Sequence, residues 1–426
     1  MINYKQLIFS FVICCNFLLC NGQDGAVNVE RYPFVNDEFN NIQFMNDSLD
    51  FYGFFRKLDK LITTGKGKLN IVHFGGSHVQ ADIWTGKMRN NFNELINQKQ
   101  AARGWVYPYK MGHSKNNNPS NYSFEWTGKW DGCRAVFANC SGNFGLSAMQ
   151  TTTYDSNSNF TLTLKPQGKI DYLFDRIKVF YEMHHQSYKI VLDSNYTALQ
   201  IIDNKQAGYT EFVFEKPMNQ VKFQLKKTDS LQNSFRLFGM FTDLDAPGIN
   251  YNAIGVNGAS VPTYLRCALL EQQLAVVQPD LVIFSIGIND AFDPNFCQSC
   301  FEKNYEELIK KIKKACPNTA ILFTTNTDSY KRTKKNKFYQ NITGLEVKAA
   351  MRNLSYKYNT GVWDLFSVMG GLGSIQFWCK NGMANCGDLV HLRPAGYQLV
   401  GDLMFVSLIK KFEEYLKQPI AKIKHD

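Results

Sequence analysis

Ser77 stands where a serine nucleophile could act. It lies in the stretch "NIVHFGGSHVQAD" (70–82), after an apolar run and two glycines. A serine hydroxyl attacks a carbonyl carbon only when a base takes its proton, and that base is usually a histidine. The sequence must therefore be searched for a base and for further polar groups that could meet Ser77.

Two further turns follow apolar segments farther along the chain. They contain Val256-Asn257-Gly258 and Gly287-Ile288-Asn289-Asp290. In an open α/β sheet, ligands bind beyond the carboxyl ends of the strands. If the preceding apolar segments are strands of one sheet, we expect all three turns to converge on one crevice.

His391 is the candidate base among the seven histidines of the chain. It lies in "GDLVHLRPAGY" (387–397), with Asp388 three residues before it. This spacing allows one loop to present a carboxylate to one imidazole nitrogen while the other nitrogen faces a partner. An Asp-x-x-His pattern alone is weak evidence, because a histidine is more often a hydrogen-bonded surface or core residue. His78 adjoins Ser77, but we expect its ring to point into the first turn of the following helix.

The elements that would position these residues alternate between strand and helix. Apolar residues at helical spacing predict a helix over 47–63. Farther along, the pattern predicts strands with their turns over 68–75, 251–260, 279–290 and 319–327, and helices over 78–96, 261–277, 301–316 and 396–416. Repeated strand–helix units predict a parallel sheet covered by helices on both faces.

Residues 116–248 have a different pattern. Short segments there mostly alternate apolar and polar residues between turn signals, at 160–165, 176–183, 188–192, 210–215, 219–226 and 234–241. Such alternation is typical of an all-β sandwich. We therefore predict a β-sandwich inserted into an α/β domain whose two parts are 66–115 and 249–418. A helical lead-in would occupy 23–65 and a C-terminal tail 419–426.

The first 22 residues are typical of a secretory signal peptide. They contain Lys5, an apolar core from Leu7 to Cys20, and Gly22 at a plausible cleavage point. The apolar core has about 14 residues, fewer than the ~20 that span a bilayer, so a membrane anchor is the weaker interpretation. We expect an exported protein, periplasmic or extracellular, without a transmembrane segment.

The charge of the chain restricts its partners. The formal net charge is +10, which becomes +9 once Lys5 is removed with the signal. The excess is spread along the chain, apart from the basic run "YKRTKKNK" (330–337). No nucleic-acid motif accompanies this run, so we expect no nucleic-acid partner. At most, the excess would favour acidic polymers such as cell-wall glycans, or a membrane surface.

Eight cysteines remain after the signal. They are Cys133, Cys140, Cys267, Cys297, Cys300, Cys316, Cys379 and Cys386. The pairs 133/140 and 379/386 would each close a short loop, and the pair 297/300 could do so too. Disulfides form readily in exported proteins. A zinc site would need paired clusters or nearby histidines, so we favour local disulfides and expect neither a metal nor another cofactor.

The blocks around these residues resemble the SGNH (GDSL-type) hydrolases, whose landmark residues lie in four separate blocks. The matching residues, in family order, are Ser77 in "FGGSH", Gly258 in "GVNGAS", Asn289 in "GIND", and Asp388 with His391 in "DLVH". The resemblance implies a three-layer, flavodoxin-like parallel sheet that carries the inserted sandwich. It also implies a catalytic triad of Ser77, His391 and Asp388. The oxyanion hole would consist of the backbone N–H groups of Ser77 and Gly258 and the side-chain amide of Asn289.

A closer resemblance is to the peptidoglycan O-acetylesterases, in which a carbohydrate-binding-like β module interrupts the hydrolase. It rests on "GGSHVQAD" (75–82), "RGWVYPY" (103–109) and the β segments before "GVNGAS". It implies a secreted serine esterase that removes O-acetyl groups from a carbohydrate polymer, with peptidoglycan as the preferred interpretation. Secreted esterases of other acetylated polysaccharides share this build.

Gly76 departs from the family pattern, which has an aspartate that braces the turn. Glycine tolerates the strained backbone of a sharp elbow, but it lacks the hydrogen bonds of a carboxylate. A weakened protein that only binds glycans is therefore one alternative function. An O-acetyltransferase is another, because the same triad can pass the acyl group to a sugar hydroxyl. In the insertion, Trp126 and Trp130 could bind sugar or could be core aromatics.

Overall fold

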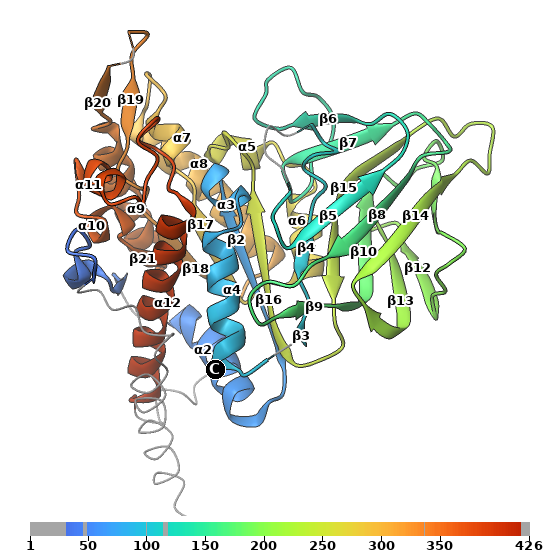
Figure 1. The fold of residues 1–426 in the computed structure, drawn as a ribbon, viewed down its shortest axis with the longest axis horizontal. Helices are drawn as coiled ribbons and strands as arrows, with labels where there is room; N and C mark the ends of the chain where they lie inside the picture. The colour runs from blue at the N-terminus through green and yellow to red at the C-terminus, as the bar shows by residue number, and fades with distance from the viewer. Residues whose placement is uncertain (1–30, 46–48, 99, 114–117, 336, 419–426) are drawn as a thin grey trace, which may run out of the picture.

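The computed structural model describes residues 31–45, 49–98, 100–113, 118–335 and 337–418. The predicted signal segment (1–22) and tail (419–426) lie outside the described residues. The chain forms an α/β part and an all-β part packed side by side (Figure 1). Within the described residues, no helix has the length and hydropathy needed to cross a bilayer.

A six-stranded sheet forms the centre of the α/β part, in the order β1-β21-β18-β17-β2-β16. Its strands are β1 (Ile42–Phe44), β2 (Lys68–Gly75), β16 (Gly248–Gly255), β17 (Leu281–Ser285), β18 (Ala320–Thr324) and β21 (Gly361–Trp363). All neighbouring pairs are parallel except β1 with β21. The parallel strands follow the 2-1-3-4-5 order of flavodoxin-like sheets, which confirms the predicted fold class. The antiparallel edge strand β1, supplied by the lead-in, was not predicted.

Helices cover both faces of this sheet. One face packs against α5 (Val261–Leu265), α6 (Leu270–Val277), α8 (Gln298–Ala315) and α9 (Thr343–Tyr358). The other packs against α2 (Leu49–Thr64), α4 (Trp84–Leu95), α10 (Leu365–Val368), α11 (Ser374–Lys380) and α12 (Pro394–Leu416). In β2, Ile71 belongs to the second cluster while Val72 and Phe74 belong to the first. Because both faces are covered, the strand is apolar almost throughout.

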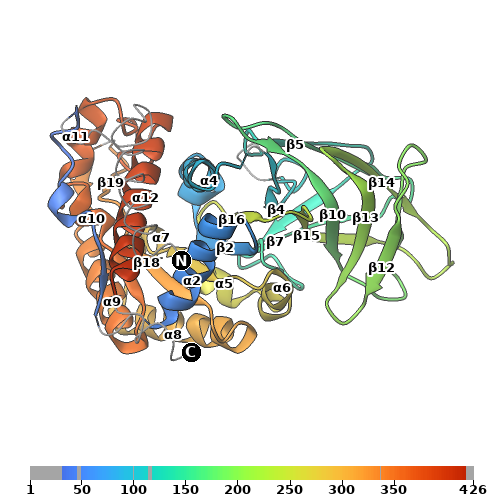
Figure 2. The same cartoon turned by 90° about the horizontal axis from the view of Figure 1, so that it is seen from below.

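The insertion is a β-sandwich, as predicted, and lies beside β16 at one edge of the central sheet (Figure 2). Its larger sheet contains β4 (Gly104–Val106), β6 (Asp131–Arg134), β7 (Met149–Thr153), β10 (Phe174–Tyr181), β12 (Gln200–Asn204), β13 (Tyr209–Met218) and β15 (Phe235–Asp243). Its smaller sheet contains β5 (Tyr122–Trp126), β8 (Asn159–Leu164), β11 (Lys189–Leu192) and β14 (Gln220–Lys226). A short pair joins β3 (Gln100–Ala101) to β9 (Asp171–Tyr172).

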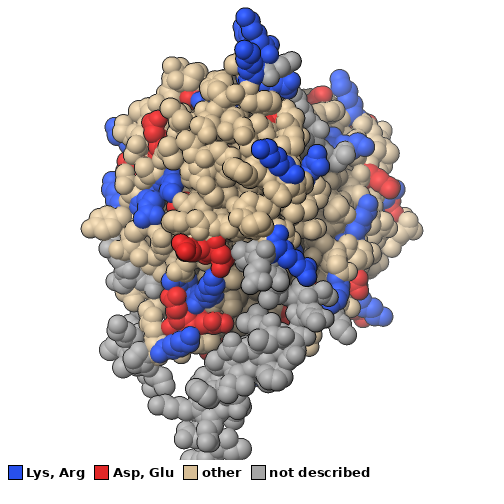
Figure 3. All heavy atoms as spheres, turned by 60° about the vertical axis from the view of Figure 1, so that its left-hand side comes forward, with Lys and Arg blue, Asp and Glu red and all other residues tan. Residues whose placement is uncertain are grey.

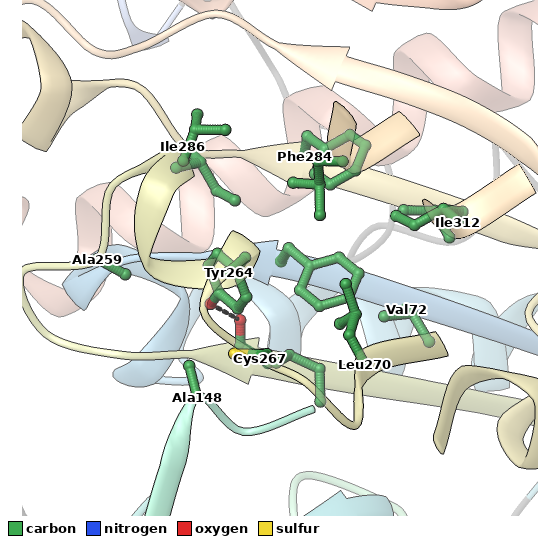
Figure 4. Packing of buried hydrophobic residues seen from close by; sticks show 14 of the residues in the cluster. Val72, Ala148, Ala259, Tyr264, Cys267, Leu270, Phe284, Ile286 and Ile312 are labelled. Carbon is green, nitrogen blue, oxygen red and sulfur yellow. Dashed lines mark hydrogen bonds between the residues drawn. The ribbon is translucent and has the colours of Figure 1, made fainter. Parts of the chain in front are cut away.

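Strand β4 lies before residue 116, the boundary expected for the insertion, yet it pairs with β15 in the larger sheet. The apolar cluster on one face of the central sheet also continues into the insertion, since Trp105, Ala148 and Phe180 belong to it together with Val72. Figure 4 shows Ala148 of the insertion among the side chains of this cluster, in which the hydroxyl of Tyr264 donates a hydrogen bond to the carbonyl of Ile254. The two parts therefore share one core.

Asp82 is the centre of a buried ion-pair network between the two parts. Its carboxylate accepts hydrogen bonds from Arg89 of α4 at 3.1 Å and from Arg103 at 2.8 Å. Asn121 of the insertion donates to it at 2.7 Å. Burial alone would raise the pKa of Asp82, but the charges of Arg103 and Arg89 and the hydrogen bonds of Arg89 and Thr85 outweigh it and hold this pKa at about 2.

Two predicted helices are broken. Residues 78–96 form α3 (Ser77–Gln80) and α4, with Asp82 between them at a φ of 53°. The segment 261–277 forms α5 and α6, and between them the N–H of Leu269 bonds to the carbonyl of Phe144 in the insertion. Apolar spacing could not reveal either break, because tertiary hydrogen bonds outweigh local helix propensity at both.

The three local disulfides that we favoured are present, Cys133–Cys140, Cys297–Cys300 and Cys379–Cys386. Cys267 and Cys316 are free and buried. Within the part of the chain that the structure describes, no three His, Cys, Asp or Glu side chains are placed to hold a metal ion.

We predict that Asp82→Ala lowers the free energy of unfolding by about 3–5 kcal/mol, because it leaves the charges of Arg89 and Arg103 buried without a counter-ion. Urea denaturation followed by circular dichroism would measure the change. Asp245→Ala is the matched control, since the Asp245 side chain is 75% exposed where it pairs with Arg176. Its loss should cost less than about 1 kcal/mol. Equal effects of the two substitutions would contradict a structural role for the buried network.

Candidate active site

Three strand ends meet at the same level of the central sheet. The parallel register places Gly75 opposite both Gly255 and Ser285. A Cβ atom on Gly255 would lie 2.1 Å from the backbone nitrogen of Gln80, and one on Gly75 would lie 2.3 Å from Cγ2 of Val79. These glycines therefore let α3 pack directly on the strand ends, where Figure 1 also shows α5 and α7 (Ile288–Ala291). The predicted convergence of the three turns is thus present.

The structure brings Ser77, His391 and Asp388 into one chain of hydrogen bonds. Ser77 Oγ lies 2.8 Å from His391 Nε2, across 314 residues of sequence. His391 Nδ1 lies 3.0 Å from Asp388 Oδ2. With the proton on Nδ1, the imidazole donates to the carboxylate, and Nε2 is free to accept the proton of the serine hydroxyl.

The loop that carries Asp388 holds its carboxylate by several bonds. Asp388 Oδ1 accepts the backbone N–H groups of Val390 at 2.9 Å and His391 at 3.0 Å, and Oδ2 also accepts from Asn385 at 2.9 Å. Burial opposes ionisation, but the hydrogen bonds from the His391 ring and the two backbone groups hold the pKa of Asp388 at about 2. Asp388 is therefore charged at neutral pH and can hold the ring of His391 in place.

His78 is a neighbour of this site, and the expectation that its ring points into the first turn of the following helix is wrong. Its ring stacks on the ring of His391 with centroids 5.3 Å apart and an interplanar angle of 22°. Its Nδ1 lies 3.0 Å from the hydroxyl of Tyr397. Burial, together with the nearby His391, lowers the pKa of His78 to about 3, so His78 stays neutral. The short helix α3 turns this side chain toward the base, and nothing in the spacing of "GGSH" indicates that.

The second block, "GVNGAS", is held in place by a contact from the insertion. Gly258 has a φ of 82°, which favours glycine. Arg134 of β6 donates to the carbonyl of Asn257 at 3.2 Å, and the N–H of Asn257 donates to Gln80 at 2.7 Å. The carbonyl of Asn257 and the N–H of Gly258 belong to one trans peptide and point in opposite directions. Arg134 therefore fixes the direction of the Gly258 N–H.

Asn289 lies beside the glycine that departs from the family pattern. Its Nδ2 donates one N–H to the carbonyl of Ala259 at 2.8 Å, and an amide nitrogen has a second N–H to give. A Cβ on Gly76 would lie 2.9 Å from this nitrogen. Gly76 has a φ of −92°, which lies outside the left-handed region that favours glycine. What glycine provides at position 76 is room for the amide of Asn289.

The two tryptophans of the insertion differ in their surroundings. Trp130 is only 3% exposed in the sandwich core, so the sugar-binding interpretation is wrong for this residue. Trp126 is partly buried and lines a hollow of about 420 Å³ on the outer face of the smaller sheet, together with Asp193, Tyr196 and Lys222. This hollow lies in the insertion, and Ser77 does not line it.

Part of the chain matches a known family. Residues 236–399 match the model of the GDSL-like Lipase/Acylhydrolase family. That segment contains Gly258, Asn289, Asp388 and His391 in the order that the family resemblance implies. Over this segment the chain resembles the SGNH-type (GDSL-like) hydrolases. The match indicates a carboxylic ester hydrolase.

Solved structures show how far the fold is shared. A peptidoglycan O-acetylesterase aligns over 88% of this chain and 99% of its own, with a TM-score of 0.72 and 20% sequence identity. An acetyl xylan esterase aligns over 38% of this chain and 82% of its own, with a TM-score of 0.30 and 23% identity. A carbohydrate esterase family 3 protein from Talaromyces cellulolyticus aligns over 39% of this chain and 73% of its own, with a TM-score of 0.29 and 15% identity. No curated protein sequence matches this one.

We predict that Gly76→Asp lowers kcat, because the new Cβ displaces the Asn289 amide. Loss of one oxyanion donor typically costs about 100- to 1000-fold. Gly76→Ala is the matched variant, since it adds the same Cβ without a carboxylate. Hydrolysis of p-nitrophenyl acetate would measure both. A faster Gly76→Asp enzyme would contradict this prediction and would show that glycine is a handicap at this position.

We also predict a pH-dependent gain in stability for Asp290→Asn. Burial raises the pKa of Asp290 from 3.8 to about 7, although a hydrogen bond from the Val261 N–H acts to lower this pKa. The residue is partly exposed, but Oδ2 is shielded and accepts no hydrogen bond from the described residues. Between pH 3.8 and 7 the folded state holds a proton that the unfolded state has lost, so stability falls as the pH rises through this window.

Asparagine cannot ionise, so the variant should gain stability over the wild type at pH 8 and gain little at pH 4. Each unit of pKa shift corresponds to about 1.4 kcal/mol. Urea denaturation of both proteins at the two pH values would test this. The same difference at pH 4 and pH 8 would contradict a protonated carboxyl at position 290.

Proposed function

We propose that this hydrolase removes O-acetyl groups from a carbohydrate polymer, with peptidoglycan as the substrate. The observation that carries the proposal is the hydrogen-bonded chain from Ser77 through His391 to Asp388 at the carboxyl edge of the sheet. A peptidoglycan O-acetylesterase shares the fold over nearly the whole of both chains, the insertion included. An exported protein would meet such a polymer, and the disulfides suit an oxidising compartment.

Acyl transfer from the ester to Ser77 is the first half of the proposed reaction. Asp388 holds His391 in the tautomer whose Nε2 faces Ser77 Oγ, and it stabilises the imidazolium that forms. His391 takes the serine proton while Oγ attacks the acetyl carbonyl carbon. The carbonyl oxygen becomes an oxyanion, and His391 then protonates the departing sugar oxygen. The products of this half are a free sugar hydroxyl and an acetyl ester on Ser77.

Three donors would stabilise the oxyanion, namely the backbone N–H groups of Ser77 and Gly258 and the second N–H of Asn289. Each donor has a fixed direction. Ser77 begins α3, the Gly258 peptide is held by Arg134, and the Asn289 amide is held by the carbonyl of Ala259. Donors that are oriented before the reaction need no reorganisation when the charge develops. Two of the three are thus fixed by contacts from outside their own block.

Hydrolysis of the acetyl-enzyme completes the reaction. Water would enter where the sugar left, and His391 would take one of its protons as the oxygen attacks the acetyl carbon. Collapse of the second oxyanion releases acetate and returns the proton to Ser77. The neutral His78, stacked on His391, adds no positive charge that would oppose the imidazolium of either half.

We predict that Ser77→Ala lowers kcat for p-nitrophenyl acetate by roughly 10⁶-fold, because nucleophile and base act as one unit. The melting temperature should not fall, since only a hydroxyl is lost. Ser230→Ala, at an exposed turn of the insertion, is the control and should be fully active. Near-wild-type activity of Ser77→Ala would refute the assignment of the nucleophile.

The identity of the polymer is tested by comparing the wild type with Ser77→Ala in parallel reactions. O-acetylated peptidoglycan and O-acetylated xylan are each incubated with and without an acceptor sugar, and acetate release is measured. Release from peptidoglycan by the wild type alone would support the proposed substrate. Release from xylan but not from peptidoglycan would overturn it. An acetylated acceptor in place of acetate would indicate a transferase.

A further inference from the structure

A basic hairpin projects from the α/β part near the candidate active site. Strand β19 (Tyr330–Arg332) pairs with β20 (Phe338–Gln340), and Figure 1 shows the pair as the most prominent projection of this part. The N–H of Thr333 bonds to the carbonyl of Lys337 at 2.8 Å, and the N–H of Lys337 bonds to the Thr333 hydroxyl at 3.1 Å. The two strands are therefore also linked by hydrogen bonds between Thr333 and Lys337.

Five cations stand on this hairpin, Lys331, Arg332, Lys334, Lys335 and Lys337. The segment 329–345 contains no aspartate or glutamate, and none of these cations forms an ion pair with a described carboxylate. Figure 3 shows the Lys and Arg side chains at the top of the molecule without acidic side chains among them. Like charges this close repel one another, and a folded chain has no need to gather them.

The base of the hairpin is part of the rim of the active site. The N–H of Tyr330 donates to the carbonyl of Leu389, which lies between Asp388 and His391 in sequence. The ammonium of Lys331 lies 5.9 Å from the ring centre of Phe292, three residues after Asn289. A long ligand that contacts the hairpin can therefore continue onto the loop of His391 and the end of α7.

We propose that this hairpin binds a carboxylate-bearing polysaccharide and guides it to Ser77. The inference rests on the proposed function, because it gives the chemical class of the polymer that this same site would deacetylate. The cations would attract carboxylates spaced along the chain. The Tyr339 side chain, 51% exposed on β20 beside Lys331, offers a ring face for a sugar.

Carboxylates of such a polymer have two sources, the lactyl and peptide groups of peptidoglycan and the uronic acids of other polysaccharides. A neutral acetylated glycan would gain nothing from five cations. An anionic membrane would be attracted by the same charges, but the base of the hairpin joins the loop of the candidate base. The structure favours a polymer that runs along this rim.

Binding is measured in the Ser77→Ala background, so that no ester is consumed. The test variant is K334Q/K335Q/K337Q, and the matched control is K216Q/K226Q/K227Q, which removes three exposed lysines from the insertion. Affinity for peptidoglycan sacculi, polygalacturonate, neutral cellulose, and phosphatidylcholine vesicles containing phosphatidylglycerol is determined by sedimentation or affinity electrophoresis. Circular dichroism and melting temperature confirm that the variants are folded.

We expect the hairpin variant to bind sacculi, polygalacturonate or both about tenfold more weakly at roughly 50 mM salt, with the difference lost near 1 M salt. The control variant should bind like its parent. Loss of binding to one acidic polymer only identifies the source of the carboxylates. Equal losses in both variants, no loss in the hairpin variant, or a loss confined to the vesicles would each overturn the inference.

The proposed function can fail separately. A wild type that binds acidic polymers through the hairpin but releases no acetate from their acetylated forms would refute the proposed reaction and leave the binding surface standing. Acetate release from peptidoglycan can also be compared between the wild type and K334Q/K335Q/K337Q with Ser77 intact. Equal release by the two would refute the binding surface alone.

Discussion

Strand β2 lies between β16 and β17, and the register of the two parallel pairs places Gly75 level with Gly255 and Ser285. Ser77, Gly258 and Asn289 follow these positions by only a few residues, so the register decides that they share one crevice. A slip by one residue would also turn every buried side chain of β2 to the opposite face. The apolar clusters on both faces of the sheet therefore hold the site in place. The glycines at the strand ends then allow α3 to lie close enough to present Ser77.

Electrostatic interactions set the charge states of the side chains that lie near the site. Three ionisable groups near the site each have a partner or an environment that determines their charge. Asp82 stays ionised between two arginines, Asp388 stays ionised under backbone N–H groups, and His78 stays neutral through burial. The insertion takes part in this arrangement through Asn121, which bonds to Asp82, and through Arg134, which orients the Gly258 peptide. The β-sandwich is thus a component of the candidate active site as well as a neighbour of it.

Much of the fold and of the site could be predicted because the relevant signals are local. Continuous apolar runs between glycines indicate buried parallel strands, and alternation over 160–241 indicates a sandwich. Asp388 and His391 could be paired because three residues separate them in one loop. The breaks at Asp82 and after α5 could not be predicted, since they depend on Arg103 and on the carbonyl of Phe144, both outside the helices concerned. The same holds for β4, which joins the sandwich only because β15 lies beside it.

The sequence by itself determined the class of the fold, the order of the blocks, the three short disulfide loops and the basic run at 330–337. These features depend on residue types and on spacings of a few positions, which the chain carries in any conformation. Only the tertiary structure decided that His78 stacks on His391, that Gly76 makes room for Asn289, that Trp130 is core, and that the basic run is a hairpin on the rim of the site. Each of these is a contact between segments far apart in sequence, and such contacts exist only once the strands have paired and the helices have packed.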